Sequence, residues 1–172
     1  MSDAPAPLLP APYLEMMASG VSVIVASCSP AMVPSVMRAV GSEVGNGGRD
    51  ITVFVTRSQS AQLLQDIATT GRVSVVFSAP RSHRTVQVKS RHARLRELAP
   101  SDLATLLRYR DAMEVEVGAV GFPPVFVHAM LAHRVDDVVA ICFSPEQAFD
   151  QSPGPNAGAS LMPAPPTPGA AP

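Results

Sequence analysis

Three polar side chains alternate with valines in the segment Thr85-Val86-Gln87-Val88-Lys89. Because successive side chains of a strand point to opposite faces, Thr85, Gln87 and Lys89 share one face while both valines face a core. The shared face carries a hydroxyl, an amide and an ammonium group, which can hydrogen-bond a phosphate or the polar edge of a ring. Lys89 is also the single lysine of the chain, beside twelve arginines. We predict that this row is the working surface of the protein.

An arginine interrupts an apolar face in the strand expected over residues 32–44. Counted by twos, Arg38 shares that face with Val36 and Val40. Burial of an unpaired guanidinium is costly, so Arg38 should meet an anion. The sequence leaves three alternatives open: a bound phosphate, a salt bridge to an Asp or Glu, or an exposed position on an edge strand.

A helix is expected to begin directly after the strand that ends in Thr56. Ser58 or Ser60 can cap it, because serine is a favoured residue at helix N-termini. The free backbone N–H groups and the positive end of the helix dipole would attract an anion there. This helix start is therefore a second predicted anion-binding position.

Composition indicates a small-molecule protein. The chain has 172 residues, 47% of them hydrophobic, a net charge of -1 and a pI near 6.4. One domain with a proper core fits this length, and the charge argues against binding to nucleic acid or to a membrane surface. Cys28 and Cys142 lie in apolar runs and are predicted to be buried free thiols. With no signal peptide or membrane span at the N-terminus, we expect a cytoplasmic protein.

Short catalytic and metal-binding motifs are absent from the sequence. It contains no Cys-x-x-Cys pair, no His-Glu-x-x-His, no phosphate-binding P-loop and no nucleophile elbow. The four histidines lack metal-ligand spacing, and Glu114 and Glu116 are two residues apart, so they do not face one another on a helix. The residues themselves identify no catalytic acid, base or metal site.

Periodicity predicts a mainly β chain with short helices. We expect a disordered Pro-rich N-terminus over residues 1–12, one domain over 13–150, and a disordered Pro/Gly/Ala-rich tail over 151–172. Predicted strands are 21–26, 32–44, 51–56, 73–77, 85–95 with a β-bulge near Ser90 or Arg91, and 134–143. Predicted helices are 13–19, one starting after Ser60, 100–118 and 122–132, with a helical turn at 145–149 and a hairpin turn at Gly45–Gly48.

This order of elements resembles the pyridoxamine 5'-phosphate oxidase-like, FMN-binding split-barrel family. The resemblance is carried by a strand with an arginine, a hairpin, the strand end Phe54-Val55-Thr56, a helix opened by Ser60, the segment VSVVF and the strand Arg84-Thr85-Val86-Gln87-Val88. It covers residues 32–95 well and 13–150 loosely. It implies a six-stranded antiparallel split β-barrel with flanking helices, a homodimer, and FMN in a cleft between the subunits.

The resemblance also implies which residues would hold the cofactor. Seven are carried over by position: Arg38, Val55, Thr56, Ser60, Arg84, Thr85 and Gln87. The chain departs from the family at Ala61-Gln62, where an Arg-Lys pair is frequent. Two phosphate contacts are thereby lost, and Arg57, Arg84 and Lys89 are the cations available to compensate.

Three functions follow from the resemblance. The first is an FMN-dependent oxidoreductase acting on a small molecule through the flavin. The second is a non-catalytic carrier of heme, with His83 as a candidate axial ligand, or of a deazaflavin or another cofactor. The third is a structural dimer that has lost its cofactor, as the Ala61-Gln62 substitution allows.

Overall fold

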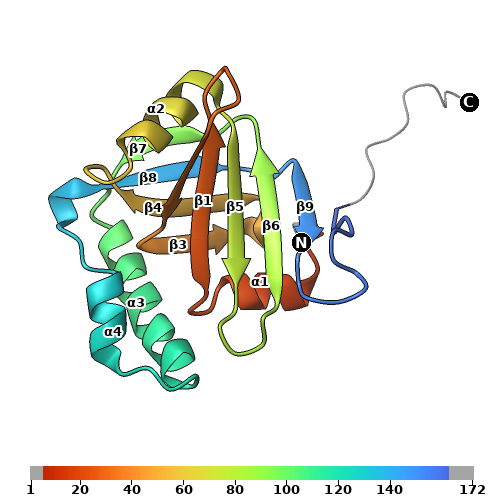
Figure 1. Cartoon of the computed structure of the whole chain (residues 1–172), viewed down its shortest axis with the longest axis vertical. Helices are drawn as coiled ribbons and strands as arrows, with labels where there is room; N and C mark the ends of the chain where they lie inside the picture. The colour runs from red at the N-terminus through yellow and green to blue at the C-terminus, as the bar shows by residue number, and fades with distance from the viewer. Residues whose placement is uncertain (1–5, 163–172) are drawn as a thin grey trace, which may run out of the picture.

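Strands with valine at every second position build two antiparallel sheets in the computed structural model, which describes residues 6–162 (Figure 1). The strands are β1 (Ser22–Cys28), β2 (Pro34–Arg38), β3 (Gly41–Gly45), β4 (Asp50–Thr56), β5 (Val73–Ser78), β6 (Thr85–Ser90), β7 (Arg94–Glu97), β8 (Val138–Phe143) and β9 (Gln147–Asp150). One sheet has the strand order β2-β1-β5-β6-β9, and the other has the order β3-β4-β8-β7. The mainly β, antiparallel architecture is confirmed.

Helices flank the sheets, also as predicted. They are α1 (Ala11–Met17), α2 (Ala61–Thr70), α3 (Asp102–Gly118) and α4 (Pro124–Met130), with short 3-10 turns η1 (Asn46–Gly48) and η2 (Val135–Asp137). The turn at η1 joins the paired strands β3 and β4, and Asn46 and Gly47 adopt the positive φ angles expected of a hairpin turn. The helical turn predicted at 145–149 is wrong, because Gln147–Asp150 pairs with β6 as a strand.

The core lies between the two sheets. Val23, Val75 and Val88 on the five-stranded sheet and Val53 and Val55 on the four-stranded sheet are all 0% exposed. Burying a valine side chain contributes roughly 1.5–3 kcal/mol, so these alternating positions hold the sheets face to face. One face of the five-stranded sheet is thereby committed to the core.

Two long strands pass from one sheet to the other and are each divided in two; together with β9, this accounts for the nine strands of residues 6–162 where the resemblance implies six. At the first corner, the Ala39 N–H donates to the Val23 carbonyl at 3.0 Å and the Val40 N–H donates to the Phe54 carbonyl at 2.8 Å. The predicted strand 32–44 is therefore divided into β2 and β3. The predicted strand 85–95 is likewise divided into β6 and β7, and the break lies beside the predicted bulge.

The other face of the five-stranded sheet is not covered by any helix of the described residues. Figure 1 looks onto this face, with the four-stranded sheet behind it. Most of its side chains are half-buried, and Val36 is 60% exposed. We call it the open face; its outward residues are Ser22, Ile24, Ala26, Cys28, Val36, Arg38, Ser74, Val76, Ser78, Thr85, Gln87, Lys89, Gln147 and Phe149.

The chain ends that are described pack against the domain. Leu9 is buried beside the core, and the Leu161 N–H donates to the Ala148 carbonyl at 2.9 Å. Disorder is predicted for residues 1–12 and 151–172; residues 6–12 and 151–162 of these are described and make the contacts just named, and residues 1–5 and 163–172 lie outside the described residues. Within residues 6–162, the helices are too short or too polar to cross a bilayer. Cys28 and Cys142 are free thiols, as predicted, but each is half-buried rather than buried.

Candidate functional site

Strand pairing aligns residues from five strands into rows across the open face. One row consists of Arg38, Ile24, Val76, Gln87 and Phe149. Arg38 and Gln87 therefore occupy the same face and the same level, with two strands between them. Three strand spacings of ~4.8 Å place their backbones about 14 Å apart. Both side chains can thus contact one ligand that spans the intervening small and aliphatic residues.

The next row brings Lys89 onto the same surface. It consists of Val36, Ala26, Ser74, Lys89 and Gln147. The Lys89 ammonium lies 5.2 Å from the centroid of the Phe149 ring, a cation–π distance. The Gln87 amide donates to the Ser74 hydroxyl at 3.0 Å. The predicted shared face of Gln87 and Lys89 is confirmed, and small side chains form the floor beside it.

Thr85 and Arg84 lie at the opposite end of β6 from Lys89. The Thr85 hydroxyl donates to the His83 carbonyl at 3.0 Å and lies 2.8 Å from the Ser78 hydroxyl. The Arg84 guanidinium lies 5.9 Å from the centroid of the Tyr13 ring. Arg84 thus contacts α1, and His83 is an exposed residue of the β5–β6 turn with a φ of 57°.

Arg38 stands where β2 leaves the open face for the four-stranded sheet. Its guanidinium donates to the Ser22 hydroxyl at 2.8 Å. No carboxylate of residues 6–162 forms an ion pair with it, so the predicted salt bridge to an Asp or Glu is absent there. A guanidinium has five N–H donors, and the single hydroxyl leaves most of them available. Arg38 can therefore receive an anion.

The start of α2 lies toward the Arg38 end of β2. Near the other end of the helix, the Thr70 hydroxyl contacts the Cys28 carbonyl at 3.4 Å and the Ser35 hydroxyl donates to Asp66 at 2.6 Å. Because Cys28 and Ser35 belong to the hairpin end of β1 and β2, the helix runs antiparallel to β2. Arg38 and Ser60 consequently belong to the same corner of the molecule.

Ser60 is the N-cap residue of α2, as predicted, but its side chain makes no capping hydrogen bond. The Ser58 N–H donates to the Asp137 carboxylate at 2.9 Å, and its hydroxyl donates to the same carboxylate. Ser60 is 2% exposed, and its hydroxyl oxygen lacks a hydrogen-bond partner within the described part of the chain. A carboxylate of the protein itself thus binds Ser58, two residues before the N-cap of α2.

The remaining residues assigned to this corner are buried or neutralised. Val55 and Thr56 are 0% and 5% exposed and belong to the interior of the four-stranded sheet. Arg57 donates to both carboxylate oxygens of Glu97, at 2.7 and 2.9 Å. Arg57 is therefore not free to replace the missing Arg-Lys pair at residues 61 and 62.

Sequence reasoning missed two cations, Arg72 and Arg91. The β5–β6 register ends where Val73 pairs with Ser90, so Arg72 directly precedes β5 and Arg91 directly follows β6. Both line a cavity of about 690 Å³ at the Lys89 end of the open face. The available signal was the placement of an arginine just outside each of two strands joined by a short turn.

Comparisons with known proteins identify the fold. No protein-family model matches the chain, and no curated protein matches it either. Solved structures do match. HupZ of Group A Streptococcus has a TM-score of 0.53 at 13% identity, over 87% of this chain and 99% of that one.

Two further structures agree. A candidate pyridoxamine 5'-phosphate oxidase of Lactobacillus delbrueckii has a TM-score of 0.52 at 14% identity, over 82% of this chain and 93% of that one. An F420 reductase has a TM-score of 0.52 at 16% identity, over 81% of this chain and 98% of that one. Similarity at such low sequence identity shows the fold alone. The chain has the split-barrel fold of the pyridoxamine 5'-phosphate oxidase-like proteins.

Proposed function

We propose that the protein binds a phosphate-bearing flavin, FMN in the first place, on its open face and serves as an oxidoreductase for a small molecule. The observation that carries this proposal is the row that joins Arg38 to Gln87, with Lys89 in the next row. These side chains offer a guanidinium, an amide and an ammonium to one ligand over a floor of small residues. A bound flavin would supply the electron or hydride transfer.

The protein's own groups would bind and orient the flavin. The Gln87 amide, already positioned by Ser74, can hydrogen-bond the polar edge of a ring. Ile24 and Val76, between Arg38 and Gln87, offer an aliphatic surface to the ring plane. We assign no catalytic acid or base, because no titratable group on the open face has the partner that such a role requires.

Two copies of the chain would enclose the ligand. The open face carries Ile24, Val76 and Val36, and Met32 and Val33 beside it are 66% and 62% exposed. Exposed apolar surface of this kind is often an interaction site, and an isologous dimer would cover the same face on both copies. Arg38 of one copy and Gln87 of the other would then both face the space between the subunits.

Absorbance of the purified protein tests the proposal directly. Flavin bands, or uptake of added FMN, would support it. A Soret band would favour the heme carrier, and uptake of F420 but not FMN would favour a deazaflavin. A colourless protein that takes up none of these would overturn the proposal.

Substitutions locate the binding surface. Arg38→Ala and Lys89→Ala should each weaken FMN binding about tenfold or more, because a charge-assisted hydrogen bond contributes roughly 1.5–3 kcal/mol. Arg108→Ala is the matched control, since Arg108 lies on α3 and pairs with Glu43 at 3.6 Å. Fluorescence titration measures all three, and unchanged affinity in both test variants would place the flavin elsewhere.

A further inference from the structure

We infer that the cavity at the Lys89 end of the open face is an anion-binding site, formed by Arg72, Lys89 and Arg91, and that it receives the phosphate of the bound ligand. The part that concerns FMN rests on the function proposed above. The site itself concerns any phosphate monoester. It differs from the position that the sequence suggested, the start of α2.

The two arginines flank the last residue pair of two neighbouring strands. The β5–β6 register ends where Val73 pairs with Ser90, so Arg72 directly precedes β5 and Arg91 directly follows β6. Both arginines line the same cavity as Lys89. Cations that line one cavity repel each other, and a bound anion would offset this repulsion.

None of the three cations has a carboxylate partner among residues 6–162. The Arg72 guanidinium contacts two sulfur atoms instead, Sδ of Met32 at 2.8 Å and Sγ of Cys28 at 3.8 Å. Thioether and thiol sulfurs are weak acceptors. A phosphate oxygen would therefore replace them readily, and Met32 is exposed enough to move aside.

The single acid that lines the cavity is occupied. The Glu146 carboxylate accepts a hydrogen bond from the Arg91 backbone N–H at 2.5 Å and lies 3.6 Å from the His92 ring. The cavity is thus lined by three cationic side chains and one carboxylate, and that carboxylate already accepts a hydrogen bond from the protein. A volume of about 690 Å³ is within the range of sites for nucleotide-sized ligands.

The start of α2 offers much less to a phosphate. The Asp137 carboxylate already accepts from Ser58, and Arg57 is neutralised by Glu97 at 2.7 Å. Positions 61 and 62 are alanine and glutamine. A phosphate there would lie near the Asp137 carboxylate, with Arg38 as the one nearby cation that has no carboxylate partner among residues 6–162, whereas the cavity presents three such cations. Electrostatics therefore favour the cavity.

Comparing FMN with riboflavin isolates the phosphate. Wild-type protein should bind FMN more tightly than riboflavin. Arg72→Gln and Arg91→Gln should each weaken FMN binding about ten- to hundredfold and leave riboflavin binding unchanged. Arg108→Gln is the matched control and should change neither. If the FMN-to-riboflavin affinity ratio is the same in both test variants as in wild type, the inference is wrong.

A second measurement separates this inference from the proposed function. Inorganic phosphate should raise the melting temperature of the wild-type protein, and Arg72→Gln should abolish that rise. If neither flavin binds but the phosphate effect persists and depends on Arg72, the anion site stands and the flavin function falls. If phosphate has no effect on wild type and FMN binds no better than riboflavin, the anion site falls.

Loss of fold would not mimic these results. Arg72 and Arg91 are both exposed, and removing one of three positive charges that line one cavity should not lower the melting temperature of the free protein. A variant that melts well below wild type without ligand would show that the removed arginine stabilises the fold, and would contradict its assignment to the anion site.

Discussion

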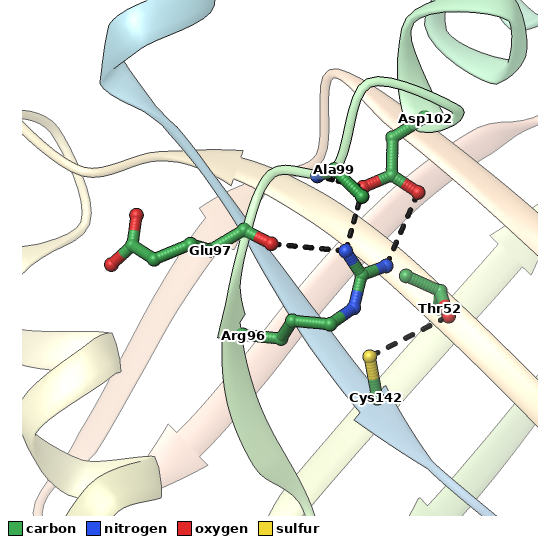
Figure 2. Close-up of polar contacts among 6 residues, drawn as sticks. All are labelled: Thr52, Arg96, Glu97, Ala99, Asp102 and Cys142. Carbon is green, nitrogen blue, oxygen red and sulfur yellow. Dashed lines mark hydrogen bonds and ion pairs between the residues drawn. The ribbon is translucent and has the colours of Figure 1, made fainter.

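Two arginines on strands of the two sheets have opposite surroundings. Arg96 on β7 donates to both carboxylate oxygens of Asp102, at 2.7 and 3.2 Å, and to the Glu97 carbonyl at 2.9 Å (Figure 2). The Asp102 carboxylate also accepts from the Ala99 N–H at 2.7 Å. Arg38 on β2 has one hydroxyl partner, Ser22. The first arginine ties β7 to the start of α3, and the second is left open to a ligand.

The two sides of the molecule also differ in whether their other cationic residues form ion pairs. On the side of the four-stranded sheet and α3, Arg57, Arg108 and Arg110 pair with carboxylates. On the open face, Arg38 and Lys89 form no ion pair within the described residues. These two cations of the open face are therefore available to an anionic ligand.

Breaking the dimer should have the largest effect. Val36→Asp places a carboxylate on the open face at a position 60% exposed, so the monomer should still fold. Paired across an isologous interface, the two new charges would repel each other and shift the protein toward monomer. Sedimentation measures the shift. Val115→Asp is the control, because Val115 is 69% exposed on α3, and an equal shift there would contradict a dimer through the open face.

Removing the carboxylate that holds Arg96 should lower stability. Asp102→Ala leaves the Arg96 guanidinium and the Ala99 N–H without their partner, at a cost of about 1–3 kcal/mol. Arg38→Ala should change the free energy of unfolding of the ligand-free protein by less than about 0.5 kcal/mol. Urea denaturation measures both, and equal losses would mean that the two arginines do not differ as their partners indicate.

Lowering the pH should also reveal the stability that the Arg96–Asp102 pair contributes. The hydrogen bond from Arg96 holds the pKa of Asp102 below its ordinary value. An acid with a lowered folded-state pKa contributes stability that is complete above the unfolded-state pKa, near 3.9, and is lost as the pH falls through the folded-state value. Asp102→Asn should therefore lose less stability than wild type on acidification. Asp150, whose pKa is also lowered, by hydrogen bonds from Ser152, would leave part of the slope in place.

Local sequence patterns predicted which side chains of β6 share a face, but they could not predict contacts between residues far apart in the sequence. The alternation of Thr85, Gln87 and Lys89 follows from strand geometry alone, so their common face could be predicted. Parity also placed Arg38 on one face with Val36, but the sequence took that face for an apolar one, whereas Val36 is 60% exposed on the open face. The approach of Asp137 to Ser58 and of Glu97 to Arg57 joins residues 79 and 40 positions apart, which no local pattern encodes.

Strand register explains the other misses. Arg72 and Arg91 line one cavity because β5 and β6 pair side by side, and Gln147–Asp150 is a strand because it pairs with β6. The bend at Ala39–Val40 likewise depends on long-range hydrogen bonds, because Ala39 donates to Val23 in one sheet and Val40 donates to Phe54 in the other. In each case tertiary pairing decides the outcome, and local propensity is a weak guide.

The smallest effect is expected at Arg57, and it sharpens the comparison most. The Arg57–Glu97 pair is exposed, so Arg57→Ala should cost at most about 1 kcal/mol. If the ligand phosphate binds in the Arg72 cavity, FMN affinity should also stay within about twofold of wild type. Fluorescence titration beside Arg72→Gln measures this. A tenfold loss of FMN affinity in Arg57→Ala, with no loss in Arg72→Gln, would indicate that the phosphate binds at the start of α2. Arg57 would then have to release Glu97 in order to bind the ligand.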